Sequence, residues 1–390
     1  MISSIARTPI GRFRGGFTPL TAMDLGGFAI AAALDRAGLT GDQIDEVLFG
    51  HVIQTGQGQV TSRQAAFMGG IPMTVPSTTI DKVCLSGMAT IADADFRIRA
   101  GESRIVMTGG MESMTNAPHV LPAARFGFGY GGTELVDSLN RDGLVCAFDD
   151  VLMGVSTDER NASLGIGRTE QDQWSVASHE RAIAATESGA FDDEIIPVEV
   201  PQRRGDPILI EHDEGMRPGT TLESLGNLRP AFISDGTGTV TAGNASQISD
   251  GAAALVVADR DAAEELGMPI VAEILAYGQT AGPDTSLQAQ PANAMRIALA
   301  KAGLEVSDLD LVEINEAFAS VSLHSTKLLG IPFDRVNVNG GAIALGHPLG
   351  TSGARIVVTL ISALRARGGG IGGAALCGGG GQGDALIVKV

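Results

Sequence analysis

An internal repeat is the first clue to the fold of this chain. The segment ALDRAGLTGDQIDEV at 33–47 aligns without gaps on ALAKAGLEVSDLDLV at 298–312. Ser86-Gly87 then matches Ser352-Gly353, and MTGG at 107–110 matches LCGG at 376–379. The matches keep their order at offsets between 265 and 269 residues. Collinear matches at a nearly constant offset indicate a duplicated unit of about 115 residues.

Each copy alternates helical and strand-like periods, which predicts a largely parallel sheet with helices on its faces. In the first copy an apolar helix begins just after Cys84 and precedes the strand RIVMTG at 104–109; the second copy has an equivalent helix around 357–364 and the strand IGGAALC at 371–377. Helices with so few polar positions are usually buried between layers. We therefore expect an α/β protein, a duplicated α/β/α/β/α sandwich.

A long insertion separates the two copies. Residues 116–249 have no counterpart in either copy and contain charge-rich runs together with a helical stretch at 171–185, which favours an ordered loop domain. The run DGAAALVVADR at 250–260 reads as a buried strand returning to the first copy. We therefore predict an N-terminal half at 1–115 plus 250–268, an inserted loop domain at 116–249, and a C-terminal half at 269–390.

Composition excludes several classes of function. The 27 Lys and Arg against 45 Asp and Glu give a net charge of -18, which repels phosphate backbones and anionic membrane surfaces, so we expect no nucleic-acid or membrane partner. The three cysteines form no C-x-x-C pattern and do not suggest a disulfide framework. Since there is also no signal peptide and no apolar run long enough to span a membrane, we expect a cytoplasmic location.

Two cysteines and a histidine are the candidates for chemistry. Cys84 lies just ahead of a predicted helix, where the helix dipole favours a thiolate, although a lone cysteine is also a common buried apolar residue. His347 lies in a Gly- and Pro-rich loop between the strand-like RVNVN and a helix. Cys377 lies between two strands and is followed by four glycines, which let a backbone approach a ligand closely.

The duplication gives these residues a common location. Cys84 and His347 each precede the central helix of their own copy, and Cys377 follows the next strand at the sheet edge where α/β proteins bind ligands. Asn315 follows the strand-like LDLVEI and is either a helix N-cap or an amide that orients a water or a substrate oxygen. We predict no metal site, because the two thiols and the imidazole lack a fourth ligand.

At these residues the chain resembles the thiolase family. The blocks that carry the resemblance are ARTPIGRF, DKVCLSGM, GGMESMTNAPH, TAGNASQISDGAAA, EINEAFA, NVNGGAIALGHPLGTSGAR and LCGGGGQG, and they run from one end of the chain to the other. The likeness is closest to acetyl-CoA acetyltransferases and 3-ketoacyl-CoA thiolases. It implies two similar α/β halves with a loop domain, assembled as a homodimer or homotetramer.

The resemblance also implies roles for individual residues. Cys84 would be the acylated nucleophile and Cys377 the acid and base, while His347 would both activate Cys84 and help to form an oxyanion hole. Asn315 would hold a water in one oxyanion hole, and the N–H groups of Gly379 and Cys84 would form a second. Coenzyme A would lie along the insertion, contacting matching positions at Arg217, Ser224, Phe232, Ala242, Ser246, Ala317 and Phe318. Met153 lies in a segment linked to the pantetheine arm, where Leu152 replaces the His of many biosynthetic members. Leu287 lies in a segment linked to acyl chain length, where short-chain-specific members often have Met.

The implied activity is the reversible condensation of two acetyl-CoA molecules to acetoacetyl-CoA and coenzyme A, within fatty acid metabolism. Thioester exchange between thiols is nearly isoenergetic, so a cysteine can carry the acyl group reversibly. No metal or redox cofactor is expected, because coenzyme A is a substrate and product. Cleavage of longer 3-ketoacyl-CoA substrates remains an alternative, and a non-catalytic acyl-CoA or lipid-binding relative is a more distant one.

Overall fold

The computed structural model describes all 390 residues and contains two central sheets of the same design. The first has the order β1-β10-β5-β3-β4, with the short β2 also paired to β10, and the second has the order β11-β14-β13-β12. In the first sheet β5, β3 and β4 run parallel to one another, and β10 is antiparallel to both of its neighbours. In the second sheet only β12 and β13 are parallel, and β14 is antiparallel to both of its neighbours, so the expectation of largely parallel sheets was wrong. The bounds are β1 Ile2–Arg7, β2 Gly11–Arg12, β3 Glu46–Gly50, β4 Ser77–Ile80, β5 Ile105–Ser113, β10 Ser249–Ala258, β11 Glu273–Ala281, β12 Leu311–Ile314, β13 Ile371–Gly378 and β14 Gln382–Lys389.

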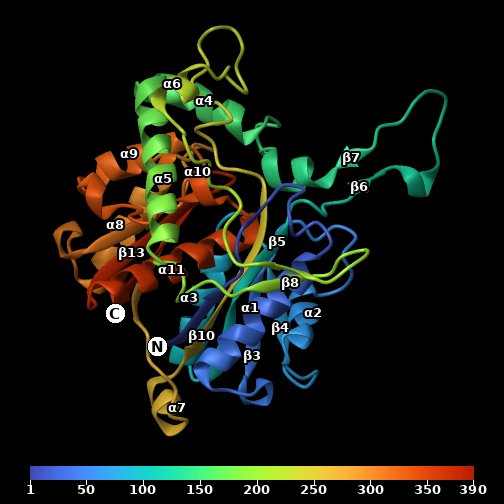
Figure 1. The fold of residues 1–390 in the computed structure, drawn as a ribbon. Helices are drawn as coiled ribbons and strands as arrows, with labels where there is room; N and C mark the ends of the chain where they lie inside the picture. The colour runs from blue at the N-terminus through green and yellow to red at the C-terminus, as the bar shows by residue number, and fades with distance from the viewer.

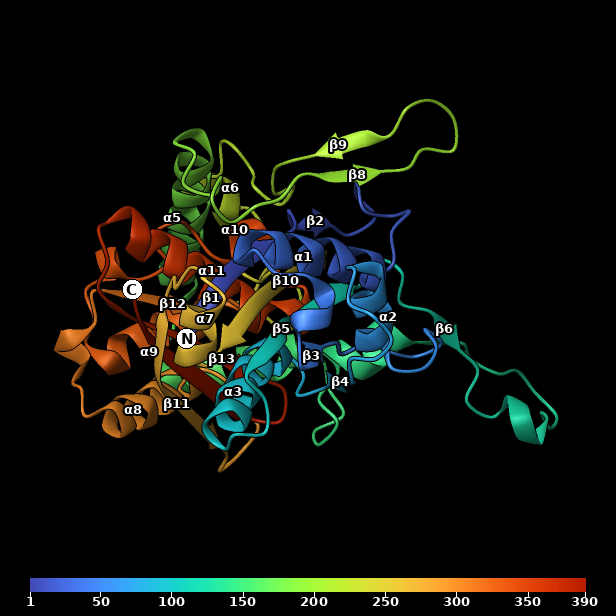
Figure 2. The same ribbon diagram turned by 90° about the horizontal axis from the view of Figure 1, so that it is seen from below.

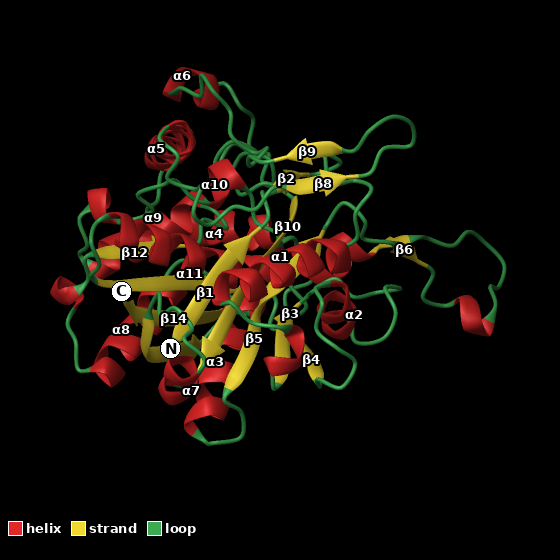
Figure 3. Ribbon diagram, turned by 60° about the horizontal axis from the view of Figure 1, so that its bottom comes forward, coloured by secondary structure: helices red, strands yellow, loops and turns green.

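Helices form three layers around these sheets (Figure 3). The central layer consists of α3 (Ser86–Arg99) and α11 (Leu349–Ala366), which contact each other and strands of both sheets. Outside the first sheet lie α1 (Ala22–Ala37) and α2 (Thr61–Met68); outside the second lie α8 (Gln290–Ala302) and α9 (Ala319–Leu329). This arrangement confirms the predicted α/β/α/β/α sandwich. The strands β1, β10, β5 and β3 correspond in order to β11, β14, β13 and β12, whereas β4 has no counterpart in the second sheet.

The central helices pack unusually closely because glycines line their crossing. A Cβ atom added at Gly353 would lie 2.4 Å from the backbone nitrogen of Met88, and one at Gly87 would lie 2.8 Å from the carbonyl oxygen of Gly350. Backbones can therefore touch where side chains would normally separate them. This contact brings the N-terminal ends of α3 and α11, and hence the loops before them, into the same region.

The inserted residues lie outside both sheets (Figures 1 and 2). They include α4 (Met153–Leu164), α5 (Arg168–Glu187), α6 (Leu222–Gly226) and the short hairpins β6 (His119–Val120) with β7 (Val136–Asp137) and β8 (Val198–Val200) with β9 (Ile208–Ile210). The helix expected at 171–185 is thus confirmed within α5, and the strand expected at 250–260 is β10. The predicted domain boundaries remain a prediction.

Two local expectations were wrong. The strand-like RVNVN forms no strand: Val336 makes a single bridge to Val312, and Asn337 has a left-handed backbone with φ of 49°. The Asn337 side chain replaces the missing ladder, because its Oδ1 accepts from the Ile314 N–H and its Nδ2 donates to the Ile314 carbonyl, both at 2.8 Å. Asn315 is not a helix N-cap, since α9 begins only at Ala319.

The remaining helices are short. They are α7 (Arg260–Glu265), which follows β10, and α10 (Ala342–Leu345), which precedes the His347 loop. None of the helices combines the length and the apolar character that crossing a membrane requires.

Candidate functional site

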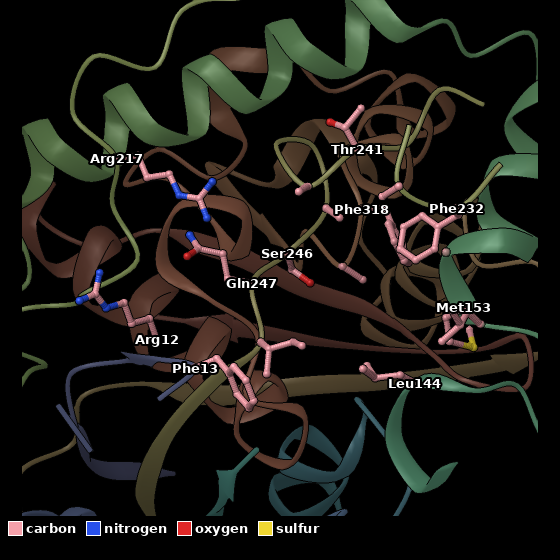
Figure 4. A pocket seen from close by; sticks show the side chains of 17 residues that line it. Arg12, Phe13, Leu144, Met153, Arg217, Phe232, Thr241, Ser246, Gln247 and Phe318 are labelled. Carbon is pink, nitrogen blue, oxygen red and sulfur yellow. The ribbon is translucent and has the colours of Figure 1, made fainter. Parts of the chain in front are cut away.

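Two cavities that share part of their lining form the candidate site. The inner cavity has a volume of about 70 Å³ and is lined by Cys84, His347, Cys377 and Gly379, together with apolar side chains. The outer cavity has a volume of about 520 Å³ and lies between the inserted residues and the two halves (Figure 4). Residues lining both are Leu144, Met153, Ser246, Ala317 and Phe318. The thiols therefore lie at the inner end of a larger pocket.

Cys84 lies one residue before the N-cap of α3 and is partly exposed to the inner cavity. Burial raises the pKa of its thiol to about 12, although the N–H groups of Gly379 and of Cys84 itself act to lower it. The backbone N–H groups therefore act in the expected direction, but they do not make Cys84 a thiolate in the free protein. Loss of hydration outweighs the backbone dipoles here, because the thiolate would sit among apolar neighbours.

His347 is held between Gly346 and Pro348, the N-cap of α11. Its Nδ1 lies 2.6 Å from the Ser352 hydroxyl oxygen, and that hydroxyl is 2.9 Å from the Pro348 carbonyl. Since a hydroxyl has one proton and the carbonyl can only accept, Ser352 donates to Pro348 and accepts from the imidazole. The proton of neutral His347 is thus on Nδ1, which leaves Nε2 as a base.

The environment of His347 keeps its ring neutral. Burial lowers the pKa of His347 to about 3, and the positive charge of Arg355 acts in the same direction. With a neutral imidazole and a neutral Cys84 thiol, the resting site contains no charged thiolate–imidazolium pair. The arrangement can instead transfer the Cys84 proton to Nε2 during attack, as general base catalysis requires.

Cys377 lies near the end of β13, where its register partner on β14 is Gly383. The thiol is buried, and burial together with the nearby Cys84 raises its pKa. The following turn uses Gly380 and Gly381, whose φ values of 77° and 69° suit glycine. This turn places the Gly379 N–H toward Cys84, so backbone donors and both thiols face one small space.

Asn315 is buried behind the imidazole. Its Nδ2 lies 3.4 Å from His347 Nε2, and its Oδ1 has no hydrogen-bond partner. An unpaired buried amide oxygen is costly, and a bound water is the usual remedy. The structure therefore places Asn315 where it can orient a polar atom beside His347 Nε2.

The residues expected to contact coenzyme A mostly line the outer cavity. Arg217, Phe232 and Ala242 do so, as do the shared residues Met153, Ser246, Ala317 and Phe318, while Leu287 lines the inner cavity. Ser224 lies outside both: its hydroxyl donates to the Thr221 carbonyl and accepts from the Thr221 N–H, which caps α6. The binding roles of the residues that line the cavities remain predictions, whereas the position of Ser224 argues against the contact that the resemblance implied for it.

Sequence reasoning missed several residues. Arg12, Phe13 and Gln247 line the outer cavity, and Figure 4 shows Arg12 near Arg217 at the end away from Met153. Arg12 belongs to the block ARTPIGRF, which was a usable signal. Ser352 was also missed, although it is the duplicate of Ser86. Ser86 has an equivalent role, because it donates to the Val83 carbonyl at 2.6 Å and accepts from the Lys82 N–H at 2.8 Å.

Two family descriptions match the chain along nearly its whole length: "Thiolase, N-terminal domain" matches residues 1–261, and "Thiolase, C-terminal domain" matches residues 268–390. A Mycolicibacterium smegmatis protein named "Probable acetyl-CoA acetyltransferase" is 51% identical over 389 residues, which is 100% of each chain. A Chromobacterium violaceum protein named "Acetyl-CoA acetyltransferase" is 46% identical, covering 100% of this chain and 98% of its own. A Staphylococcus epidermidis protein named "Probable acetyl-CoA acyltransferase" is also 46% identical, with the same coverage.

These matches include every block that forms the inner cavity, from the loop before α3 to the turn after β13. The family that the sequence matches therefore agrees with the geometry of the site, in which two thiols and an imidazole line one cavity. The chain belongs to the thiolase family and is an acyltransferase.

Proposed function

We propose that the protein is an acetyl-CoA C-acetyltransferase, which condenses two acetyl-CoA molecules reversibly to acetoacetyl-CoA and coenzyme A. The observation that carries this proposal is the inner cavity, where Cys84, Cys377 and the basic Nε2 of His347 meet at the inner end of a pocket. The condensation needs one thiol that carries the acyl group and one that transfers protons, and Cys84 and Cys377 can fill these two roles.

The first half-reaction acetylates Cys84. As Sγ attacks the thioester carbonyl, its proton passes to His347 Nε2, which Ser352 leaves available. The bond to coenzyme A breaks, and the coenzyme A sulfur takes that proton. The Gly379 and Cys84 N–H groups are the donors for the carbonyl oxygen, and removing one such donor typically costs about 2.7 to 4 kcal/mol of transition-state stabilisation.

The second half-reaction removes a proton from the methyl carbon of another acetyl-CoA, and the carbanion attacks acetyl-Cys84. The new carbon–carbon bond forms as the bond to Cys84 Sγ breaks, and the proton that Cys377 has taken returns to the released Sγ. Cys377 is the base, and the Asn315 amide together with His347 stabilises the enolate oxygen through a bound water. The raised pKa of Cys377 in the free protein suits the reverse reaction, in which a protonated thiol must donate to the departing carbanion.

We propose that no metal or redox cofactor takes part. The first half-reaction exchanges thioesters and the second forms a carbon–carbon bond at the expense of a thioester bond, and neither needs an external oxidant or reductant. Asn315 and His347, with a bound water, can stabilise the enolate oxygen in place of a metal ion. Coenzyme A and its acyl thioesters are then the small-molecule partners.

The inner cavity favours short acyl groups over long ones. Its volume of about 70 Å³ is far below the roughly 300 to 1,000 Å³ of pockets that hold drug-sized ligands, and Leu287 and Leu349 are among its apolar walls. A 3-ketoacyl-CoA thiolase acting on longer chains is the alternative, and one relative has the broader name of acyltransferase. Thiolysis rates across 3-ketoacyl-CoA substrates of increasing length separate the two: short-chain preference requires a steep fall beyond acetoacetyl-CoA.

Labelled acetyl-CoA tests the proposed mechanism. Cys377→Ala should retain covalent label because Cys84 and His347 remain, but condensation should stop; Cys84→Ala should lose both label and turnover. Cys146→Ala is the matched control, since Cys146 is buried outside both cavities, and it should behave like the wild type. Equal labelling of the two active-site variants would refute the mechanism, and an unlabelled wild type would favour a non-catalytic acyl-CoA-binding protein.

The proposal also covers the cellular location, the metabolic role and the oligomeric state. We place the enzyme in the cytoplasm, in fatty acid metabolism, and as a homodimer or homotetramer. Apolar side chains such as Phe126 and Phe67 are largely exposed on the single chain, which supports self-association. Sedimentation analysis distinguishes the oligomers, and a monomer at micromolar concentration would contradict this part of the proposal.

A further inference from the structure

Lys82 connects the loop before α3 with the opposite half of the molecule. It lies two residues before Cys84, and its Nζ is 2.8 Å from Asp384 Oδ1 and 2.9 Å from Oδ2. Asp384 lies on β14 and has no exposed surface, whereas 24% of the Lys82 side chain is exposed. The ion pair therefore joins a loop of the first half to a buried strand of the second.

All other polar contacts of the Lys82 ammonium also come from the second sheet. It lies 3.1 Å from the Tyr277 hydroxyl and 3.4 Å from Gln279 Oε1, both on β11, and 5.8 Å from the centre of the Tyr277 ring. Three protein partners thus surround the three protons of one ammonium. Such a side chain has little freedom, in contrast to the usual mobile surface lysine.

The two ends of this contact lie next to the two thiols. In the first half, the backbone N–H of Lys82 donates a hydrogen bond to Ser86 Oγ at 2.8 Å, and this bond fixes the turn that holds Cys84. On the second half, the register partner of Asp384 is Leu376, one residue before Cys377. The ion pair consequently joins the two segments that carry the thiols.

A second ion pair between the halves provides a contrast. Arg260 and Glu273 lie 3.4 Å apart, but their side chains are 50% and 43% exposed and neither lines the inner cavity. Exposed pairs of this kind contribute little to stability. The Lys82–Asp384 pair differs because Asp384 is buried, and removing the partner of a buried carboxylate strongly destabilises the structure around it.

We propose that Lys82 and Asp384 are positioning residues that set the separation between Cys84 and Cys377. The inference rests on the proposed function, in which the second half-reaction needs both thiols. The relation of Cys84 to His347 is secured separately, by the close packing of α3 on α11 at Gly87 and Gly350. Acetylation of Cys84 therefore depends less on this ion pair than condensation does.

The test compares the two half-reactions in Lys82→Met. We expect condensation to slow by about 100-fold, as for a misplacement near 1 Å, while acetylation of Cys84, followed by mass spectrometry, slows by less than about threefold. Arg260→Gln is the matched control and should leave both rates unchanged. Equal losses in both half-reactions, or unimpaired condensation, would overturn the proposal.

A bifunctional thiol reagent tests the separation without relying on activity. Phenylarsine oxide condenses with two neighbouring thiols and releases water, so we expect the wild type to bind it through Cys84 and Cys377, and Lys82→Met to bind it at least about tenfold more weakly. Unchanged binding by the variant would overturn the proposal. If the wild type fails to act on acetyl-CoA, the proposed function fails, but this comparison still decides whether the ion pair positions the thiols.

Asp384→Asn keeps the test decisive if Lys82→Met does not fold, as judged by circular dichroism. The asparagine retains an oxygen for the ammonium while removing the charge, so the fold is less disturbed. We expect the same order of effects, with condensation reduced more than acetylation and arsenical binding weakened. An Asp384→Asn enzyme with wild-type condensation and wild-type arsenical binding would refute the positioning role.

Discussion

At the scale of single residues, burial decides where the protons of the inner cavity reside. The thiol of Cys84 has its pKa raised to about 12, and the imidazole of His347 has its pKa lowered to about 3. An acid is protonated below its pKa and a base is neutral above it. At pH 7 both groups are therefore uncharged, and the proton leaves Cys84 only as the nucleophile attacks.

This protonation state predicts a titration that thiolate absorbance near 240 nm can follow. We expect the difference between the wild type and Cys84→Ala to be flat from about pH 4 to pH 9 and to rise only in strongly alkaline solution, because the Cys84 pKa is about 12. Cys146→Ala serves as the control for the subtraction. A step between pH 4 and pH 7 would indicate a thiolate–imidazolium pair and contradict the neutral assignment.

The positions of Cys84, His347 and Cys377 could be inferred from sequence because each lies at a fixed place in a repeated unit. Their protonation could not, since desolvation depends on what other segments bring into contact. Ser352 shows the same limit: its match to Ser86 is visible in the sequence, but its contact with His347 Nδ1 depends on the rotation of the ring. Asn315 allowed two local interpretations, and only the start of α9 at Ala319 excluded the helix N-cap.

At the scale of elements, the crossing of α3 and α11 controls how the two halves meet. Glycines at the crossing let the helix backbones touch, and the loops carrying Cys84 and His347 lead directly into these helices. Apolar periodicity predicted both helices, but it could not predict how closely they approach. The site geometry therefore depends on a contact that contains almost no side chains.

Gly353→Ala should disturb this crossing. The added methyl group would lie 2.4 Å from the Met88 backbone nitrogen, and backbone atoms cannot move aside cheaply. We expect a loss of about 1 to 3 kcal/mol in the free energy of unfolding, measured by urea denaturation, as for overpacked cores.

Gly129→Ala is the matched control for that variant. Gly129 has open space around its Cβ position and no positive φ, so the change should stay within about 0.5 kcal/mol of the wild type. Equal stability of Gly353→Ala and the wild type would show that α3 and α11 can separate without cost.

At the scale of the whole molecule, the net charge of -18 opposes the binding of an anionic substrate. The outer cavity offsets this locally, because the guanidinium groups of Arg12 and Arg217 both line it (Figure 4). His179 holds the backbone of Arg217 in place, since its Nδ1 accepts a hydrogen bond from the Arg217 backbone N–H at 3.3 Å. The sequence revealed the total charge, but not that residues 12 and 217 come together.

Binding of the coenzyme A phosphates should therefore depend on Arg217. Arg217→Ala should raise KM for acetoacetyl-CoA by about tenfold or more, the effect of losing one hydrogen bond to a charged group, while kcat changes by less than about twofold. The physical reason is that a phosphate far from the reacting carbon is bound equally in the ground state and in the transition state. Steady-state thiolysis assays at fixed ionic strength measure both constants.

Two comparisons make this result specific to the phosphates. Acetoacetyl-pantetheine lacks the nucleotide phosphates, so Arg217→Ala and the wild type should use it equally well. Ser224→Ala should leave KM for the full coenzyme A ester unchanged, because Ser224 caps α6 outside the outer cavity. A fall in kcat with unchanged KM in Arg217→Ala would instead place this arginine in the chemistry, and a raised KM in Ser224→Ala would mean that coenzyme A extends beyond the cavity toward α6.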